Sequence, residues 1–246
     1  MKRLLFISII SVLAASPAMA ALSVNYNYVD NTNHALSSIY TYLPGFTVDT
    51  YDLSGTGTPD AGTGWTYTAG PGGYQIVQND VPNEASAPYD GYATAGGTGK
   101  DTSYYLSVPD GGVPTSGTYG TMYYVTVDFG VDNLTYLGLH WGSEDNFNEI
   151  AFYKDGNPIE TITGSQVNGN GNGAQDATLA NRYVNIFTSF TFDSIQIRSY
   201  EYNTPQTIDP YAFELDNLSV AAPLPGAVLL GILGLGAAGI KMRKYA

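Results

Sequence analysis

Short runs of alternating apolar and polar residues recur between residues 21 and 222, and this period of two restricts the fold more than any other feature. Clusters of Gly, Pro, Asn and Asp separate the runs, as expected for strands joined by turns. No window between the two ends of the chain has the period of an amphipathic helix. The pattern predicts an all-β fold, a single β-sandwich or jelly-roll-like domain, with strands at LSVNYNYV (22–29), MYYVTVDF (122–129), LTYLGLHW (134–141), NEIAFY (148–153), PIETIT (158–163), FTFDSIQIRSY (190–200) and AFELDNLSV (212–220).

One hairpin is visible from its turn residues. Asp155, Gly156 and Asn157 stand between two of these runs, and such residues tolerate the positive φ that a tight turn needs. Residues 54–120 are rich in Gly and Pro and have few apolar runs, so two interpretations stay open there: long loops over the same sandwich, or irregular strands. No shift in composition marks a second domain, which favours one domain over 21–222.

Charge is divided unevenly between the ends and the body of the chain. Five of the nine basic residues lie near the two termini, whereas all 22 acidic residues lie between them. With its four basic residues, the body 21–222 has a net charge of −18, which predicts no nucleic acid partner because phosphates are repelled. The chain has no cysteine, which excludes disulfides, thiolate metal sites and a cysteine nucleophile.

The N-terminus has the layout of a secretory signal peptide. A basic start precedes an apolar run from Leu4 to Ala15, and small residues follow at Ala18 and Ala20. This layout predicts cleavage after Ala20 and a mature chain that starts at Ala21. The expected partners are the Sec export machinery and signal peptidase. An uncleaved N-terminal membrane helix, the alternative, needs a longer apolar run.

The C-terminus has a similar layout in reverse order. A Pro-Leu-Pro motif precedes the apolar stretch 226–240, and the chain then ends on a basic tail. As a helix these 15 residues span roughly 22 Å, whereas a bilayer core of ~30 Å needs about 20 residues. The basic tail is expected to stay on the cytoplasmic side, which leaves the body exported. Two interpretations follow, a durable membrane anchor or a removable sorting signal, and both rest on Pro223, Leu224, Pro225, Lys241, Arg243 and Lys244.

This ending resembles the PEP-CTERM sorting signal, in the variant in which Leu224 replaces the middle Glu. The resemblance implies an exosortase partner, a membrane-embedded transpeptidase-like enzyme of Gram-negative bacteria that make exopolysaccharide. It also implies a transient inner-membrane intermediate, followed by a place at the cell surface or outside the cell. The expected division is a signal peptide at 1–20, a β-sandwich domain at 21–222 and a sorting signal at 223–246, with its apolar helix over 226–240 and its basic tail over 241–246.

The acidic segment 144–149 is the part of the sequence that could bind a metal ion or carry out catalysis. Carboxylate and amide oxygens from Glu144, Asp145, Asn148 and Glu149 are ligands that Ca²⁺ accepts. A pair of carboxylates also suits acid and base roles in glycoside cleavage. The third interpretation, which we favour, is a solvated turn in which Asp and Asn side chains bond to the nearby backbone. Calcium is the one cofactor that the sequence suggests, and no catalytic residue is predicted.

The same region resembles a recurrent segment of exosortase-dependent surface proteins, which has no assigned activity. Alternation along this segment predicts Trp141 in the core and His140 on the opposite, wetter face. The strand 212–220 resembles the last strand that leads into the tag in such proteins. The match of the segment is at Tyr136, Leu139, Trp141, Gly142, Ser143, Asp145, Asn148, Ile150, Phe152 and Tyr153.

Twenty-one tyrosines and Trp65 allow a sugar-binding surface, although most aromatic residues in β-rich chains pack across strands. The sequence therefore predicts a non-enzymatic exported protein of the cell surface or extracellular matrix, associated with exopolysaccharide or biofilm. Polysaccharide is the further partner that this prediction implies. Two alternatives stay open: a carbohydrate-binding module or weak glycoside hydrolase, and a periplasmic protein that its C-terminal anchor retains.

Overall fold

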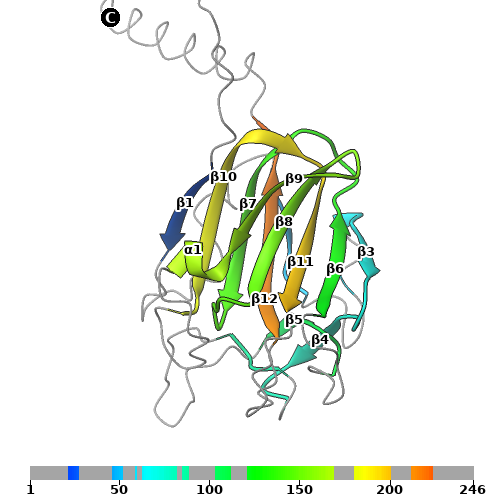
Figure 1. Cartoon of the computed structure of the whole chain (residues 1–246), viewed down its shortest axis with the longest axis vertical. Helices are drawn as coiled ribbons and strands as arrows, with labels where there is room; N and C mark the ends of the chain where they lie inside the picture. Colours follow the sequence, from blue (N-terminus) through cyan, green and yellow to red (C-terminus); the bar gives the residue numbers. More distant parts are fainter. Residues whose placement is uncertain are drawn as a thin grey trace, which may run out of the picture.

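The computed structural model describes residues 22–27, 46–51, 59, 63–81, 85–88, 103–111, 121–168, 180–200 and 212–223. Within these residues, two antiparallel β-sheets enclose one hydrophobic core (Figure 1). The prediction of an all-β sandwich is confirmed. Helix α1 (Gly164–Asn168) is a single short turn that follows the last strand of the smaller sheet's hairpin.

The larger sheet has seven strands, in the order β1-β10-β7-β12-β5-β4. Strand β12 pairs with β5 along its first half and with β2 along its second half, which accounts for the seventh strand. The strands are β1 (Leu22–Asn27), β2 (Phe46–Asp49), β4 (Gln75–Gln78), β5 (Tyr104–Val108), β7 (Leu134–Gly142), β10 (Arg182–Phe192) and β12 (Phe213–Ala221).

The smaller sheet has five strands, in the order β3-β6-β11-β8-β9. Its central strand β11 pairs with β6 on one side and with β8 on the other, so residues from three distant segments meet on each face. The strands are β3 (Thr66–Ala69), β6 (Met122–Asp128), β8 (Asn148–Lys154), β9 (Asn157–Thr163) and β11 (Ser194–Tyr200).

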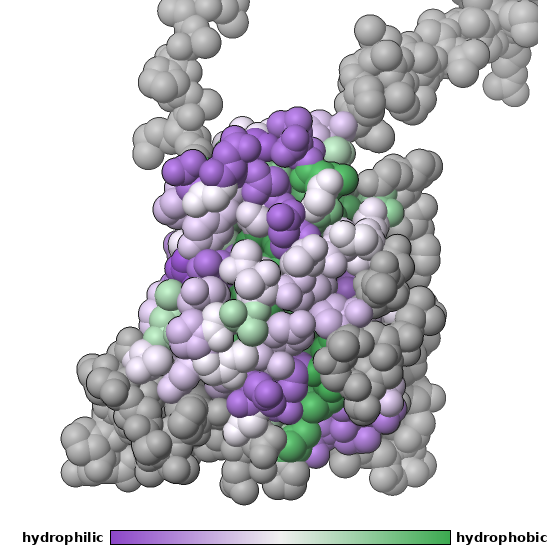
Figure 2. Space-filling view, turned by 90° about the vertical axis from the view of Figure 1, so that its right-hand side faces the viewer, coloured by the Kyte–Doolittle hydropathy of each residue, from purple (hydrophilic) through white to green (hydrophobic). Residues whose placement is uncertain are grey.

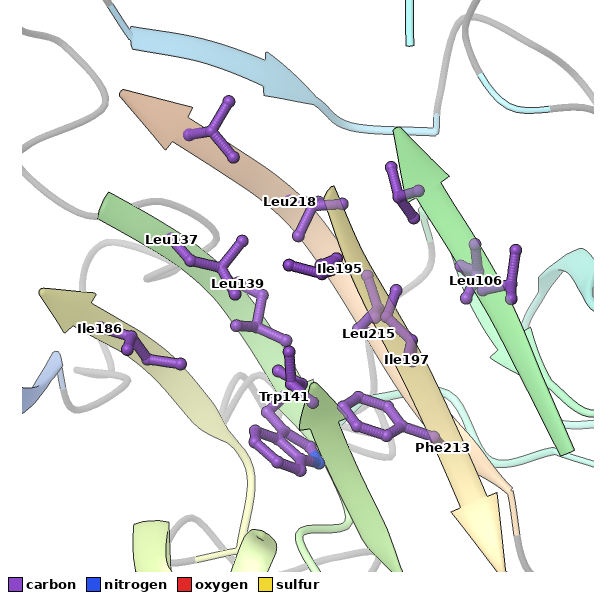
Figure 3. Close-up of a cluster of buried hydrophobic side chains, with 14 of the residues drawn as sticks. Leu106, Leu137, Leu139, Trp141, Ile186, Ile195, Ile197, Phe213, Leu215 and Leu218 are labelled. Carbon is purple, nitrogen blue, oxygen red and sulfur yellow. The ribbon is translucent and has the colours of Figure 1, made fainter. Parts of the chain in front are cut away.

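Alternate residues of both sheets form the core between them (Figure 3). Trp141 at the end of β7 is fully buried and stacks on Phe213 of β12, with ring centroids 4.5 Å apart and planes 17° apart. The prediction that Trp141 belongs to the core is confirmed. From the smaller sheet, Ile195 and Ile197 of β11 are likewise fully buried in this core. Burial of these apolar side chains is the main force that holds the two sheets together.

The predicted hairpin is confirmed. Strands β8 and β9 pair antiparallel, and Asp155 and Gly156 between them have positive φ angles of 51° and 73°. The prediction is wrong for Asn157, which is not among the positive-φ residues and begins β9. The predicted strand 190–200 is wrong as a single strand, because β10 ends at Phe192 and β11 begins at Ser194. The chain passes from the larger to the smaller sheet at this point. A period of two continues across such a crossing, and the sequence therefore did not reveal it.

Within 54–120, the structure describes three short strands, β3, β4 and β5. For these parts the presence of strands is confirmed, but the strands are not irregular, since each pairs in continuous antiparallel register. Among the described residues, no helix is long and apolar enough to cross a membrane. The predicted signal peptide at 1–20 and the apolar stretch 226–240 lie outside the described residues, so both stay predictions.

Candidate functional site

The connection from β7 to β8 carries the first of the predicted calcium ligands, and it is buried. Ser143, Glu144 and Asp145 are 6%, 0% and 6% exposed. The expectation of a solvated turn is therefore wrong for these three residues. Each of them has a hydrogen-bond partner inside the protein, which is the condition under which polar groups are buried.

Glu144 forms a buried ion pair with Arg182, the first residue of β10. The Nε and Nη2 atoms of Arg182 donate hydrogen bonds to the carboxylate over 3.0 to 3.3 Å, and the two side chains are 0% and 5% exposed. The backbone amide of Glu144 also donates to the carbonyl of Ala180 at 2.7 Å. Because a guanidinium stays charged in proteins, Glu144 is needed as its counter-charge and joins two distant segments.

Asp145 bonds to the turn that precedes β8. Its Oδ1 accepts hydrogen bonds from the backbone amides of Phe147 (2.7 Å) and Asn148 (2.9 Å). This is the local bonding that the third interpretation predicted, and it is confirmed for this residue. The fully buried side chain of Asn148 donates through Nδ2 to the carbonyl of Ala212 at 3.1 Å. Both residues therefore fix the backbone where β8 begins.

Glu214 of β12 adds a further buried carboxyl group to this region. It pairs with Gly142 in the sheet register and is 3% exposed. Its Oε2 accepts a hydrogen bond from the hydroxyl of Ser143 at 2.5 Å, and its Oε1 accepts one from the backbone amide of Ser86 at 3.0 Å. Glu214 thus connects β12 both to the β7–β8 connection and to the segment 85–88.

Burial raises the pKa of three of these carboxyl groups, because their charged form loses its hydration. The pKa of Glu144 rises to about 7, against the effect of its hydrogen bonds and ion pair with Arg182. The pKa of Glu214 rises to about 8; hydrogen bonds from Ser143 and Ser86 oppose this shift, and the nearby Asp145 adds to it. The pKa of Asp145 rises to about 6, against the effect of the two amides that bond to it. All three groups therefore bind protons more tightly in the folded protein than in the unfolded chain.

These shifts predict that the protein is more stable in mild acid than in mild alkali. A carboxyl group whose pKa rises on folding stabilises the folded state fully below its unfolded pKa, and this contribution is lost as the pH rises through its folded pKa. The midpoint of thermal unfolding is expected to fall between about pH 5 and about pH 8.5, and Glu214→Gln should flatten the fall. Circular dichroism melts across this range test the prediction, which a constant or rising midpoint contradicts.

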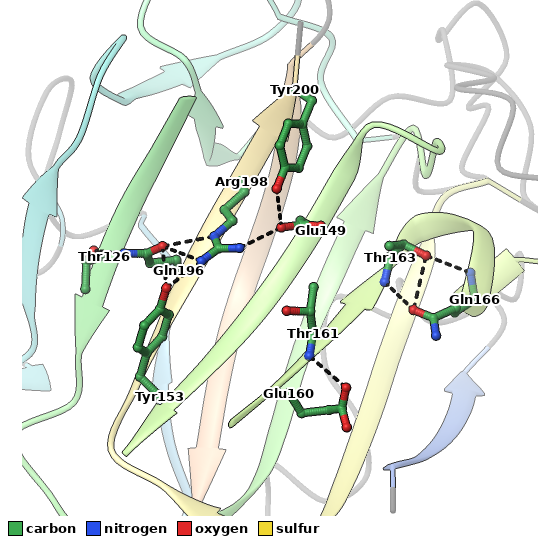
Figure 4. Close-up of polar contacts among 10 residues, drawn as sticks. All are labelled: Thr126, Glu149, Tyr153, Glu160, Thr161, Thr163, Gln166, Gln196, Arg198 and Tyr200. Carbon is green, nitrogen blue, oxygen red and sulfur yellow. Dashed lines mark hydrogen bonds and ion pairs between the residues drawn. The ribbon is translucent and has the colours of Figure 1, made fainter. Parts of the chain in front are cut away.

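Glu149 lies elsewhere, on the outer face of the five-stranded sheet. Residues of β11 alternate between core and surface, so that Gln196, Arg198 and Tyr200 face outward. Arg198 pairs with Glu149 in the register, and its Nη1 donates to Glu149 Oε1 at 2.7 Å. The hydroxyl of Tyr200 donates to the same oxygen at 2.7 Å (Figure 4). Glu149 is thus part of a surface group that is separate from the buried carboxylates.

The structure does not gather the four predicted calcium ligands round one point. Glu144 bonds to a buried arginine, Asp145 to backbone amides and Glu149 to an arginine on the outer face. Asn148 shares only a backbone hydrogen bond with Asp145. Calcium binding by this set stays a prediction, and the arrangement of the four side chains does not favour it.

Another group of carboxylates in the described residues lies close enough to share a cation. Ligand oxygens of Asp132, Asp155 and Asp193 all lie within 4.8 Å of one another, at the loops that follow β6, β8 and β10. The Nζ atom of Lys154 lies 3.0 Å from Asp132 and 3.5 Å from Asp193. These contacts raise the pKa of Lys154. The cluster therefore already contains a positive charge of the chain itself.

His140 and Trp65 are buried rather than available at the surface. His140 is 0% exposed, and the expectation of a wetter face is wrong because its register neighbours on that face, Tyr183 and Asp216, are buried as well. Trp65 is 8% exposed and packs edge-on against Phe129, with ring centroids 5.0 Å apart. Trp65 belongs to the core, so it does not contribute to a sugar-binding surface.

The predicted processing residues lie at the ends of the chain. Pro223 is exposed and is the last described residue, two positions after the end of β12 at Ala221. The predicted sorting motif thus begins directly after the last strand. The other processing residues lie outside the described residues, namely Ala18, Ala20, Ala21, Leu224, Pro225, Lys241, Arg243 and Lys244.

The sequence analysis did not single out three residues that bond to the acidic side chains or to their neighbours, namely Arg182, Arg198 and Glu214. Alternation in SIQIRSY places Gln196, Arg198 and Tyr200 on one face, a signal that was sufficient to identify the outer-face group. No local pattern links Arg182 to its carboxylate partner, because the two residues are 38 positions apart. Sequence patterns therefore could not predict the buried ion pair.

No family model and no curated protein matches the chain. Among solved structures, it is similar to the K2 cleaved adhesin domain of Lys-gingipain, with a TM-score of 0.41 and 15% identity over 72% of this chain and 99% of that chain. The K1 cleaved adhesin domain of Lys-gingipain from Porphyromonas gingivalis W83 has a TM-score of 0.40 and 12% identity over 73% and 99%. The CBM32 of AlyQ in complex with 4,5-unsaturated mannuronic acid has a TM-score of 0.27 and 15% identity over 58% and 97%.

Proposed function

We propose that the protein is a non-enzymatic exported component of the cell surface or extracellular matrix, delivered by an exosortase-type system. The two ends of the sequence carry this proposal. A signal-peptide layout occupies 1–20, and a Pro-Leu-Pro motif, an apolar stretch and a basic tail occupy 223–246. The first directs export, and the second provides a membrane-bound intermediate on which a sorting enzyme acts.

The properties of the body support this destination. Its net charge of −18 favours solubility and repels anionic surfaces, and the absence of cysteine removes any dependence on disulfide formation. The core contains apolar side chains from both sheets, such as Leu139, Phe152 and Ile197, all fully buried. Such a well-packed, acidic sandwich suits a protein that acts outside the cell.

The contacts of the acidic residues support a non-enzymatic role. A glycosidase needs two carboxyl groups that face a sugar from opposite sides of the scissile bond. Glu144 is instead paired with Arg182 in the interior, and Asp145 bonds to backbone amides. Glu149 is paired with Arg198 on a different face of the molecule. None of these three carboxylates is arranged with another as an acid and base pair.

Replacement of the Pro-Leu-Pro motif tests the proposal. With Pro223, Leu224 and Pro225 all changed to Ala, the protein should accumulate in the membrane fraction of the native host and be lost from the cell surface and medium, because the sorting enzyme no longer recognises the tail. Immunoblots of the three fractions measure this. Ala222→Ser, at an exposed position just before the motif, is the matched control and should be released normally. Normal release of the triple variant contradicts sorting and favours another route.

A carbohydrate-binding role is a second candidate, and one observation favours it. The outer face of the five-stranded sheet presents tyrosine, arginine, glutamate and glutamine side chains that are bonded to one another (Figure 4). This role is compatible with the first, since an exported matrix protein has polysaccharide as its surroundings.

A further inference from the structure

The outer face of the smaller sheet carries a connected group of polar and aromatic side chains, which we call the β8–β11 face. It consists of Glu149 and Tyr153 from β8 and Gln196, Arg198 and Tyr200 from β11, and all five are partly exposed. The sheet register pairs Tyr153 with Ser194, six residues before Tyr200, so the face extends roughly 20 Å along the strands at about 3.3 Å per residue.

Arg198 lies at the centre of this face and fixes its neighbours. Its Nε and Nη2 donate to Gln196 Oε1 at 2.9 and 2.8 Å, its Nη2 donates to the hydroxyl of Tyr153, and its Nη1 donates to Glu149 Oε1. Gln196 in turn donates through Nε2 to the hydroxyl of Thr126 on β6 at 3.2 Å. The side chains of Arg198 and Glu149 are each 14% exposed, so they lie along the sheet rather than extending into solvent. A ligand would find this group already ordered, which reduces the entropy cost of binding.

The network leaves several polar atoms with capacity to bond outward. Among the described residues, no hydrogen bond reaches Glu149 Oε2, because both of its partners donate to Oε1. Arg198 Nη1 has a second N–H beyond the one that it gives to Glu149, and Gln196 Nε2 has a second N–H beyond the one that it gives to Thr126. A free acceptor and two free donors therefore lie within one small group.

This combination suits a ligand with neighbouring hydroxyl groups. A hydroxyl both donates and accepts, so two adjacent hydroxyls of a sugar ring match a carboxylate oxygen next to a guanidinium N–H. The rings of Tyr153 and Tyr200 add rigid amphipathic surface, which suits the apolar face of a sugar ring. The hydroxyl groups of these two tyrosines bond to the central group. That of Tyr153 donates to Gln196, and that of Tyr200 donates to Glu149.

Charge indicates which kind of polysaccharide fits. Arg198 and Glu149 form a pair with no net charge, and the body as a whole carries −18, so an anionic chain is repelled and an uncharged chain is not.

An apolar protein surface is a poor match for the described exterior, where Val131 is the one exposed large hydrophobic side chain. Figure 2 shows one side of the molecule, on which hydrophobic residues form only a few small areas.

We infer that the β8–β11 face is a binding site for an uncharged polysaccharide. This inference rests on the proposed export of the protein to a polysaccharide matrix, and it deepens that proposal by naming the ligand class and the residues. Glu149 Oε2 accepts from one sugar hydroxyl, the free N–H groups of Arg198 and Gln196 donate to others, and the two tyrosine rings flank the chain.

Affinity electrophoresis of the full chain, purified in detergent, tests the inference. The gels contain xyloglucan, galactomannan or a soluble β-glucan as uncharged probes and alginate as an anionic probe. We expect at least one uncharged probe to retard the protein and alginate to have no effect. Arg198→Ala should weaken that binding at least tenfold. Lys154→Ala is the matched control, since it also removes one positive charge, here with its contacts to two loop aspartates away from this face, and it should bind normally.

A second variant shows whether weaker binding by Arg198→Ala comes from the lost contacts or from a folding defect. Tyr153→Phe with Tyr200→Phe removes only two hydroxyl groups from the network, and it should weaken binding severalfold while its circular dichroism spectrum stays that of the unaltered protein. The inference is overturned if no uncharged probe retards the unaltered protein, if both sets of variants bind as well as the control, or if alginate binds more strongly. A protein that is released normally but binds no probe overturns this inference alone, whereas one that binds but stays uncleaved in the membrane overturns only the sorting proposal.

Discussion

Arg182→Ala is expected to lower the free energy of unfolding by about 3–5 kcal/mol, the cost of leaving a buried charge without its partner. The guanidinium of Arg182 contacts both oxygens of Glu144, and both side chains are almost completely buried. Removal of the arginine leaves the carboxylate inside the protein with no counter-charge. Urea unfolding, followed by circular dichroism at neutral pH, measures the loss.

Two further variants show whether this loss comes from the ion pair. The double variant Arg182→Met with Glu144→Met should recover most of the stability, because apolar side chains of similar size replace buried pairs at little cost. Lys154→Ala, which breaks ion pairs with the exposed Asp132 and with Asp193, should lower the free energy of unfolding far less than Arg182→Ala. An Arg182→Ala protein as stable as the unaltered one would show that the pair does not hold β10 to the β7–β8 connection.

Trp141→Ala is expected to lower the free energy of unfolding by about 3–5 kcal/mol, as for other large aromatic side chains removed from a core. Trp141 is fully buried between the sheets, and its ring stacks on that of Phe213 (Figure 3). The change leaves a cavity at the end of the sandwich where the buried carboxylates also lie. Chemical unfolding followed by far-ultraviolet circular dichroism measures the effect, since tryptophan fluorescence changes with the substitution itself.

Trp141→Phe separates ring packing from the indole N–H. Among the described residues, Nε1 of Trp141 is buried and has no hydrogen-bond partner. Phenylalanine keeps a ring against Phe213 and removes this unpaired donor, so the loss of stability should be clearly smaller than for alanine. Equal losses for the two variants would indicate that the stacked ring contributes little to the core.

The sequence predicted the sandwich well because its signal is local. Alternation along 134–141 assigns Trp141 to the core, and the structure confirms it. The same signal missed the change of sheet at Asp193, because strands on either side of a crossing have the same period. It also failed for His140, because alternation distinguishes the two faces of a strand but does not show whether the second face is covered.

The candidate sites were predictable only in part, because sequence patterns reveal bonding between residues that are near in the sequence but not between distant ones. Asp145 bonds to amides two and three positions away, and such short-range bonding follows from residue type. The partners of Glu144 and Glu149 are 38 and 49 positions away, and strand pairing alone brings them together. A dense acidic segment therefore looked like one site, whereas the structure divides it between the interior and the outer face.

This division clarifies the proposed function. The interior carboxylates stabilise the junction of β7, β8, β10 and β12, and their raised pKa values belong to that structural role. The outer face of the five-stranded sheet is the part of the described surface to which we assign the ligand. In the proposed account, the two ends of the chain determine where the protein goes, and the β8–β11 face determines what it holds there.

The most direct test of the central proposal is the intact mass of the mature protein, recovered separately from membranes, cell surface and medium. The account predicts a chain that starts at Ala21 and ends between Pro223 and Gly226, found at the surface or in the medium. A chain that still ends at Ala246 and stays in the membrane fraction would contradict it, and the C-terminal segment would then be an anchor.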